Sequence, residues 1–254
     1  MKIRIIIIFK TKNKLKKNIL KKIVNRKVGN SEIVEVEQLN PEEEENIFLP
    51  IASDALNITE QYNQIVFFYQ AGICQLTAKL EILRQEFQAC KDRNPIENIE
   101  TRVKSPESIK GKMERRGFPL TVSSMVKNIM DIAGIRVVCP FISDVYYIAE
   151  FLLNQEDIQE IQIKDYIKDP KENGYRSLHL IVMVTVYFSD HKCNVPVEIQ
   201  LRTIAMEFWA TLEHQLRYKK NRNHLENMQK QLKQCADLVT TADYKMQQLA
   251  DQWL

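Results

Sequence analysis

The stretch VPVEIQLRT, residues 195–203, decides the fold class of this chain of 254 residues. Apolar and polar side chains alternate in it. The apolar ones are Val197, Ile199 and Leu201, and the polar ones are Glu198, Gln200 and Arg202. Successive side chains of an extended strand point to opposite faces, so the pattern predicts a strand with one buried face and one polar face. Such a strand belongs to a sheet that helices cover on its apolar side.

Further strands are expected on both sides of this one along the chain. A second alternating run covers residues 135–141, and extended segments are expected at 99–104, 158–164 and 177–188. We therefore predict a central sheet of about five strands.

Helical spacing of apolar residues fills most of the remaining sequence. It indicates a long helix from Asn57 to about Asn94, a helix that begins at Ser105, a helix capped by Ser143, and helices after residue 203. The predicted fold class is α+β: a mixed central β-sheet flanked by helices, with helices at the N-terminal and C-terminal ends of the domain.

The charge distribution divides the chain into three parts. Residues 1–30 contain eleven Lys or Arg residues and no acid, and residues 31–54 contain eight acids and no base. Adjacent blocks of opposite charge are typical of a solvated arm, so we expect residues 1–57 to form a poorly ordered charged extension. A basic arm that contacts nucleic acid or anionic lipid and a translation start nearer Asn57 are the alternatives. Residues 58–220 then form the folded domain, and residues 221–254 form a C-terminal amphipathic helix.

The C-terminal helix carries a sustained apolar seam. Its residues step by three and four: Leu225, Met228, Leu232, Cys235, Val239, Ala242, Met246, Leu249 and Trp253. The seam can pack on the helix's own domain or on a helix of a second subunit. Because the stripe is narrow and long, we favour the second interpretation and expect a homo-oligomer.

Composition argues against export and against a membrane span. The apolar run IRIIIIF, residues 3–9, is far shorter than the roughly 20 residues that cross a bilayer. No small-residue cleavage site follows it. The five cysteines are dispersed and form no CxxC pair, which is typical of reduced thiols. We expect a cytoplasmic protein.

The segment RVKSPESIKGKMERRG, residues 102–117, gathers positive charge at the start of a helix. Within it, SPE at 105–107 supplies an N-cap, a proline at the first helical position and an acid in the first turn. A hydroxyl and four cations converge there: Ser108, Arg102, Lys104, Lys112 and Arg115. Together with the free N–H groups of the helix they could hold a polyphosphate, although a solvated basic face is the simpler interpretation.

Two acids are expected to lie opposite this cationic segment. Asp131 comes just before the strand in MDIAGIRVV, residues 130–138, and Glu198 lies on the polar side of the strand at 195–203. In the first of these strands Arg136 points away from its apolar neighbours. Mg²⁺ bound to substrate phosphates takes one or two carboxylates and otherwise water and phosphate oxygens. We therefore predict that Asp131 and Glu198 are the catalytic and metal-binding residues.

The loop KDYIKDPKENGYRSLH, residues 164–179, is rich in Lys, Asp, Pro and Gly. Tyr175 lies where the loop meets a strand and could stack on a nucleobase. Lys164, Lys171 and Asn173 lie within sequence reach of a phosphate or a base edge.

Four segments together resemble the synthetase domain of the RelA/SpoT family: RVKSPESIKGK, DIAGIRV, KDYIKDPKENGYRSLH and VPVEIQLRTIAMEFWATLEHQLRYK. More narrowly, the chain is similar to the small, single-domain RelQ-type alarmone synthetases over roughly residues 58–254. The resemblance implies a nucleotidyltransferase-like fold over 58–220 and a GTP pyrophosphokinase that moves the β,γ-diphosphate of ATP to the ribose 3′-hydroxyl of GDP or GTP, with Mg²⁺, in the stringent response.

The resemblance also implies a role for each matching residue. Arg102 and Arg136 would hold the adenine, and the remaining ATP ligands would be Lys104, Ser108, Lys112 and Arg115. Asp131 would bind Mg²⁺, while Glu198 would bind the metal, accept the 3′-hydroxyl proton, or do both. The acceptor nucleotide would be held by Lys164, Lys171, Asn173, Tyr175, His179, Gln200 and Glu213, with Tyr175 stacked on guanine.

The resemblance extends to assembly and regulation. RelQ-type proteins are tetramers, so the resemblance implies a homotetramer. It also implies two further ligands, an alarmone at an allosteric site and single-stranded RNA. The four histidines include no His-Asp dyad, so we expect no alarmone hydrolase activity. Two alternatives stay open: transfer of the diphosphate to the 3′ end of tRNA, as in toxin-like relatives, and a regulator that binds RNA or alarmone on the same fold.

Overall fold

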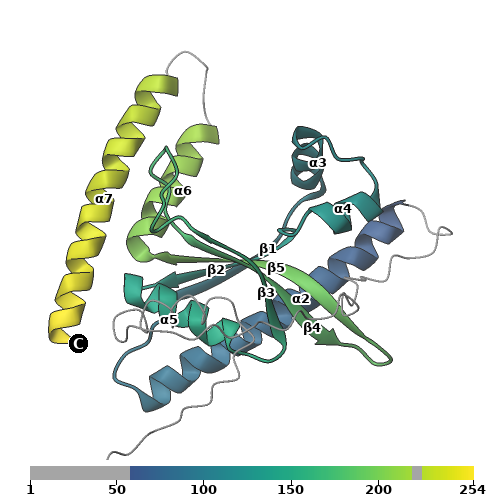
Figure 1. Cartoon of the computed structure of the whole chain (residues 1–254), viewed down its shortest axis with the longest axis horizontal. Helices are drawn as coiled ribbons and strands as arrows, with labels where there is room; N and C mark the ends of the chain where they lie inside the picture. Colours follow the sequence, from purple (N-terminus) through teal and green to yellow (C-terminus); the bar gives the residue numbers. More distant parts are fainter. Residues whose placement is uncertain (1–57, 219–224) are drawn as a thin grey trace, which may run out of the picture. The chain divides into compact units, whose positions relative to one another are not determined.

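Five strands form one mixed sheet, shown in Figure 1. The computed structural model describes residues 58–218 and 225–254. The strands are β1 (Asn98–Val103), β2 (Ala133–Cys139), β3 (Ile158–Asp165), β4 (Leu178–Tyr187) and β5 (Lys192–Thr203), in the order β1-β2-β5-β4-β3. β2 and β5 run parallel, and the other neighbouring strands run antiparallel. The predicted α+β class with about five strands is therefore confirmed.

Helices lie on both sides of this sheet, and its apolar side chains are buried on one of them. Those in the described part of the chain are α2 (Ile58–Cys90), α3 (Pro106–Arg115), α4 (Val122–Asn128), α5 (Ile142–Leu153), α6 (Ile204–Tyr218) and α7 (Leu225–Trp253). α2 and α5 contact the strands, and Figure 1 shows α3 and α6 on the opposite side of the sheet. The apolar residues Val197, Ile199 and Leu201 of β5 are fully buried, whereas Glu198 and Gln200 are only partly buried. The alternation predicted from the sequence thus separates core from site.

Two helix starts differ in how well the sequence predicted them. Ser105 caps α3, because its Oγ accepts a hydrogen bond from the backbone N of Ser108 at 3.3 Å. The predicted cap of α5 by Ser143 is wrong. The helix begins at Ile142, and the carboxylate of Asp144 accepts a hydrogen bond from the backbone N of Phe141 at 3.3 Å. An acid in the first turn therefore accepts a hydrogen bond from the backbone at this helix start, whereas Ser143 Oγ accepts one from Gln247 in α7.

The seam of α7 is divided between two environments. Near its start, Met228 and Leu232 are buried with Trp209 of α6, whose Nε1 donates a hydrogen bond to the backbone O of Leu232 at 2.9 Å. Farther along, Leu249 is 48% exposed and Trp253 is 75% exposed. The first part of the seam packs on the chain's own domain, and the last part presents apolar side chains to the surface.

Some predictions fall outside the part that the structure describes. The charged extension over residues 1–57 lies outside it, and so does the side chain of Leu225 in the seam. Among the described helices, none has both the length and the low polarity that a transmembrane segment requires.

Candidate active site

The N-terminal turn of α3 presents polar groups beside the polar face of the sheet. Ser105 Oγ donates a hydrogen bond to Ser108 Oγ at 3.1 Å, which holds the Ser108 hydroxyl at the start of the helix. Arg115 lies one turn beyond Lys112 on the same helix and is exposed, as is Ser108. The structure therefore keeps these two predicted phosphate ligands on α3 with their side chains open to solvent.

Asp131 is the point at which the cationic segment meets the sheet. Its Oδ2 pairs with the Nζ of Lys104 at 2.6 Å and with the Nζ of Lys112 at 2.5 Å. Burial alone would raise the pKa of Asp131, but hydrogen bonds and charge from the two lysines hold that pKa below its ordinary value. Asp131 is therefore ionised at neutral pH.

The second oxygen of Asp131 is available for another partner. Oδ1 is buried and accepts no hydrogen bond from any residue in the described part of the chain. Buried carboxylate oxygens are normally satisfied by protein, water or a cation. The atom therefore fits a site that binds a hard cation through oxygen.

Glu198 lies one strand away, in β5, opposite Gly134 of the parallel strand β2. Its Oε1 is 3.2 Å from Nδ1 of His179, and its Oε2 accepts a hydrogen bond from Nε2 of Gln200 at 2.8 Å. Burial and the charge of Asp131 raise the pKa of Glu198, whereas the contacts with His179 and Gln200 lower it, and the net shift is downward. The negative charge of Asp131, in the turn before β2, thus acts on Glu198 in the neighbouring strand β5.

One row of polar residues crosses the whole sheet. In register from edge to edge, it consists of Glu100 in β1, Arg136 in β2, Gln200 in β5, His179 in β4 and Lys164 in β3. Directly paired residues of neighbouring strands lie on the same face. The row therefore brings a predicted ATP residue onto the same face as three predicted acceptor residues.

A pocket at the β1 end of this row contains the two predicted adenine-binding arginines. Arg102 and Arg136 both line it, together with Gly134 and Gln200. The side chain of Arg102 lies 3.5 Å from the position that a Cβ on Gly134 would occupy, so Arg102 packs directly over this glycine. Within the described chain, Nε of Arg136 is buried without a hydrogen-bond partner. Two planar guanidinium groups beside one pocket suit the faces of a planar base.

At the other end of the row, the loop between β3 and β4 forms an aromatic cluster. The hydroxyl of Tyr175 is 2.8 Å from Nε2 of His179, and the ring of His179 lies edge-on to Tyr166 at 5.1 Å. The Nζ of Lys171 is 4.6 Å from the ring centroids of both Tyr166 and Tyr175. The ammonium group therefore lies against the face of the ring that was predicted to stack on a base.

The remaining predicted acceptor residues converge on this cluster. Asn173 Nδ2 donates a long hydrogen bond of 3.5 Å to Oε1 of Glu213 in α6. The pKa of Lys171 is lowered by burial first, and Lys164 lowers it further, while Glu198 and Glu213 act in the opposite direction. The charges that act on Lys171 therefore come from residues far apart in the sequence, on β3, β5 and α6.

Comparisons with known proteins agree with this arrangement. Residues 101–223 match the model of the region found in RelA and SpoT proteins. The GTP pyrophosphokinase YwaC of Bacillus subtilis (strain 168) is 41% identical over 193 residues, which cover 76% of this chain and 92% of that protein. The chain belongs to the RelA/SpoT family.

Solved structures of relatives have the same fold. Small alarmone synthetase 1 from Bacillus subtilis, in a crystal structure with its product pppGpp, matches with a TM-score of 0.71 and 34% identity over 76% of this chain and 98% of that one. Small alarmone synthetase 2 from the same organism matches with a TM-score of 0.67 and 40% identity over 75% of this chain and 99% of that one. This RelA/SpoT protein therefore shares the fold of the small synthetases.

Sequence reasoning left three site residues of this RelA/SpoT protein without a role. Tyr166 contacts Lys171 and His179. Arg202 is 5% exposed, and its guanidinium bonds the hydroxyl of Tyr175 at 2.7 Å and the carboxylate of Glu207 at 2.6 Å. Arg202 could have been found, because it shares its strand face with Glu198. The pattern gave no comparable signal for Glu207, since its importance depends on where α6 begins.

The acids of this RelA/SpoT protein fit a cation that substrate helps to hold. Across residues 58–218 and 225–254, no group of three or more His, Cys, Asp or Glu side chains could hold a metal ion by itself. Asp131 and Glu198 offer carboxylate oxygens only, which suits Mg²⁺ rather than a soft metal. A substrate that brings its own phosphate oxygens would complete such a site.

Proposed function

We propose that this protein transfers the β,γ-diphosphate of ATP to the ribose 3′-hydroxyl of GDP or GTP and thereby makes (p)ppGpp and AMP. A bond forms between the 3′-oxygen and the β-phosphorus as the bond from that phosphorus to the AMP oxygen breaks. The observation that carries the proposal is the placement of Glu198 on β5 and of Asp131 in the turn that leads into the neighbouring parallel strand β2. Both acids lie beside a cationic helix start and between an arginine-lined pocket and an aromatic loop.

The donor binds on the β1 side of the site. Arg102 and Arg136 hold the adenine in the pocket that they line. The phosphates lie along the start of α3, where Lys104, Lys112, the Ser108 hydroxyl and Arg115 offer donors and positive charge. Transfer of a phosphoryl-type group depends on positioning and on neutralisation of charge more than on covalent chemistry, so cations are what this step needs.

Mg²⁺ is the cofactor that the two acids fit. Asp131, through the oxygen that the lysines leave unpaired, and Glu198 would hold it beside the ATP phosphates, where it would neutralise developing charge. The lowered pKa of Glu198 keeps this carboxylate ionised, so it is able to accept the proton of the attacking hydroxyl. No side chain of the protein has to act as a nucleophile.

The acceptor nucleotide binds at the loop end of the row. Guanine stacks on Tyr175, and this requires that Lys171 leave the ring face against which its ammonium lies. The displaced Lys171, with Lys164, is then able to contact the acceptor phosphates. His179 and Gln200 flank Glu198 and direct the ribose toward it, and Asn173 and Glu213 hold the far side of the loop.

A nucleotide assay tests the proposal. The purified protein, incubated with ATP, GDP and Mg²⁺, should release AMP and a guanosine tetraphosphate, and the absence of product with both GDP and GTP would refute it. Glu198→Gln and Asp131→Asn should each lower turnover by at least about 100-fold, the usual minimum for a lost general acid or base. The matched control is Asp157→Asn, because Asp157 pairs with Lys79 of α2 away from these acids and should keep wild-type turnover.

We also propose that the protein is a homo-oligomer through the surface part of α7. Leu238, Met246, Leu249 and Trp253 are all at least 48% exposed, an apolar area that a partner helix would cover. Sedimentation of the wild type and of a Leu249→Asp, Trp253→Asp variant tests this assignment. A smaller species is expected for the variant, and equal mass for the two proteins would contradict it. The reaction's nucleotide substrates and the five free cysteines are consistent with a place in the cytoplasm.

A further inference from the structure

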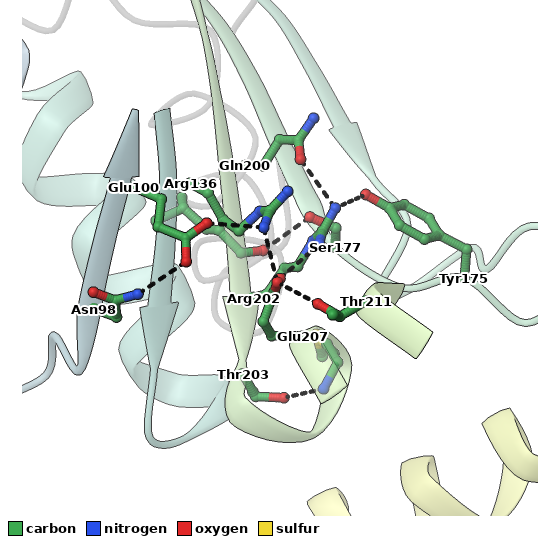
Figure 2. A network of polar contacts seen from close by, with 12 residues as sticks. Asn98, Glu100, Arg136, Tyr175, Ser177, Gln200, Arg202, Thr203, Glu207 and Thr211 are labelled. Atoms are coloured by element: carbon green, nitrogen blue, oxygen red, sulfur yellow. Dashed lines mark hydrogen bonds and ion pairs between the residues drawn. The ribbon is translucent and has the colours of Figure 1, made fainter. Parts of the chain in front are cut away.

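Glu207 lies between two parts of the proposed site. One is the donor pocket, which Arg102 and Arg136 line, and the other is the acceptor loop, which joins β3 to β4. Figure 2 shows Glu207 at the centre of a polar network. It belongs to the first turn of α6, which begins directly after β5 ends at Thr203. Its side chain is only 19% exposed. A carboxylate in that position needs well-placed partners, because an unpaired buried charge is strongly unfavourable.

The two oxygens of Glu207 bond to different halves of the site. Oε1 accepts a hydrogen bond from Nη1 of Arg136 at 2.9 Å, and Oε2 accepts one from Nη1 of Arg202 at 2.6 Å. Oε1 also accepts a hydrogen bond from Thr211 Oγ1 at 2.8 Å, from one turn farther along α6. Three donors from three elements therefore fix the orientation of this carboxylate.

Beyond Arg202, the contacts continue to the carboxylate of Glu198. Nη2 of Arg202 donates to the hydroxyl of Tyr175 at 2.7 Å and to Oε1 of Gln200 at 2.9 Å. Tyr175 in turn contacts His179, and both His179 and Gln200 contact Glu198. Every link from the adenine pocket to the acceptor loop is thus a hydrogen bond or ion pair between side chains that are at least partly buried.

We propose that Glu207 is a positioning residue that couples donor binding to acceptor binding. A nucleotide that moves Arg136 in the donor pocket shifts Glu207 with it, and Glu207 then shifts Arg202 and the Tyr175 hydroxyl for the second nucleotide. The effect is reciprocal, because a coupling free energy acts equally on both ligands. This inference rests on the proposed synthetase function and adds to it a route between the two nucleotide sites.

Glu100 provides a matched control. It also pairs with Arg136, at 3.1 Å, but it is 56% exposed and its other contact is with Asn98 at the edge strand. In the described part of the chain, Glu100 reaches Arg202 and Tyr175 only through Arg136 and Glu207, and it contacts neither of them directly. Loss of the Glu100 charge should therefore weaken donor binding without removing the coupling.

The experiment measures the dissociation constant of α,β-methylene ATP with Mg²⁺ by calorimetry, without GDP and with saturating GDP. The ratio of the two constants is the coupling, expected to be at least about fivefold in the wild type, at the lower end of typical allosteric couplings. Glu207→Gln should bring this ratio to about one and weaken both nucleotides. Glu100→Gln should keep the wild-type ratio.

Several outcomes would overturn the inference. A wild-type ratio near one, an unchanged ratio in Glu207→Gln, or equal loss of the ratio in Glu100→Gln would each do so. If Glu207→Gln does not fold, Arg202→Lys replaces it, since a lysine has no fork to bond both Glu207 and Tyr175, and it should lose the ratio while keeping the donor affinity measured alone. A wild-type protein that makes no product refutes the proposed function, whereas an active wild type with an intact ratio in these variants refutes only the role of Glu207.

Discussion

Replacement of Gly174 by alanine should separate the acceptor loop from α7. Gly174 has φ = +89°, and a Cβ at this position would lie 2.4 Å from the Cβ of Ala236 in α7. A left-handed φ costs a residue with a side chain roughly 1–2 kcal/mol. Overpacking of this kind costs about 1–3 kcal/mol more. We therefore expect Gly174→Ala to lower the free energy of unfolding by about 2–5 kcal/mol.

Gly117 separates the two contributions. It also has a left-handed φ, of +69°, but nothing lies within 4 Å of the Cβ position. Gly117→Ala should therefore lower the free energy of unfolding by the backbone contribution alone, about 1–2 kcal/mol. The difference between the two variants in urea denaturation then measures the contact between the loop and α7.

The same substitution should weaken the acceptor nucleotide. The clash is relieved if the loop moves away from α7, and Tyr175, the next residue, moves with it. About 1.4 kcal/mol of binding free energy corresponds to a tenfold change in affinity, so the KM for GDP should rise tenfold or more while the KM for ATP changes little. Adding Ala236→Gly to Gly174→Ala removes the colliding methyl group and should restore part of the GDP affinity. Equal stabilities of the Gly174 and Gly117 variants, with an unchanged KM for GDP, would refute this reasoning.

Three further predictions concern single side chains. The folded-state pKa of Asp131 is lowered, so the stability that its charge contributes is present above the ordinary value near 4 and is lost as the pH falls through the lower folded value. The difference in urea stability between wild type and Asp131→Asn should thus be smaller at pH 3 than at pH 7, and a constant difference would contradict it. Asp144 is 3% exposed and pairs with Arg93 through two hydrogen bonds of 2.6 and 2.7 Å, whereas the side chain of Arg93 is 37% exposed. Asp144→Ala should therefore lower the free energy of unfolding by about 1–3 kcal/mol, measured by thermal or urea denaturation. A decrease of under about 0.5 kcal/mol would contradict this prediction. The hydroxyl of Tyr69 is buried without a hydrogen-bond partner among the described residues. Tyr69→Phe should therefore raise the free energy of unfolding by about 1 kcal/mol. A lower free energy of unfolding in this variant would contradict the prediction and would reveal a partner such as bound water.

The sheet and most of the candidate site could be predicted because both depend on local periodicity. The alternation in residues 195–203 separates Glu198 and Gln200 from the buried side chains next to them, and this holds in β5 whichever strands flank it. Ser105 could be assigned as a cap because N-capping involves only residues within one turn. The same local reasoning was wrong for Ser143, since Asp144, next along the chain, is the better acceptor for that helix start and also pairs with a residue 51 positions away.

Features that depend on register or on contacts between distant elements could not be predicted from the sequence. Periodicity placed Arg136 on a polar face, but it could not say that Arg136 lies in one row with His179, because the row requires β5 to lie between β2 and β4. The prediction from the apolar seam of α7 is limited in the same way. A heptad pattern marks a helix face that will be buried, yet it does not say against what, and in α7 the beginning of that face meets Trp209 of the same chain while Trp253 remains exposed.

The placement of α7 gives the acceptor site a dependence on a helix that contributes no nucleotide ligand. Tyr175 packs against the cluster of Trp209, Leu232 and Ala236, and its hydroxyl is held by Arg202. Tyr175, the residue proposed to stack on the base, is therefore held from two sides, by the α6–α7 pair and by the network through Glu207. Since α7 also carries the exposed apolar residues proposed to bind a second subunit, any shift of that helix on assembly would reach Tyr175 through the contact at Gly174 before it reached the donor pocket. Subunit contacts should consequently alter the affinity for GDP more than the affinity for ATP.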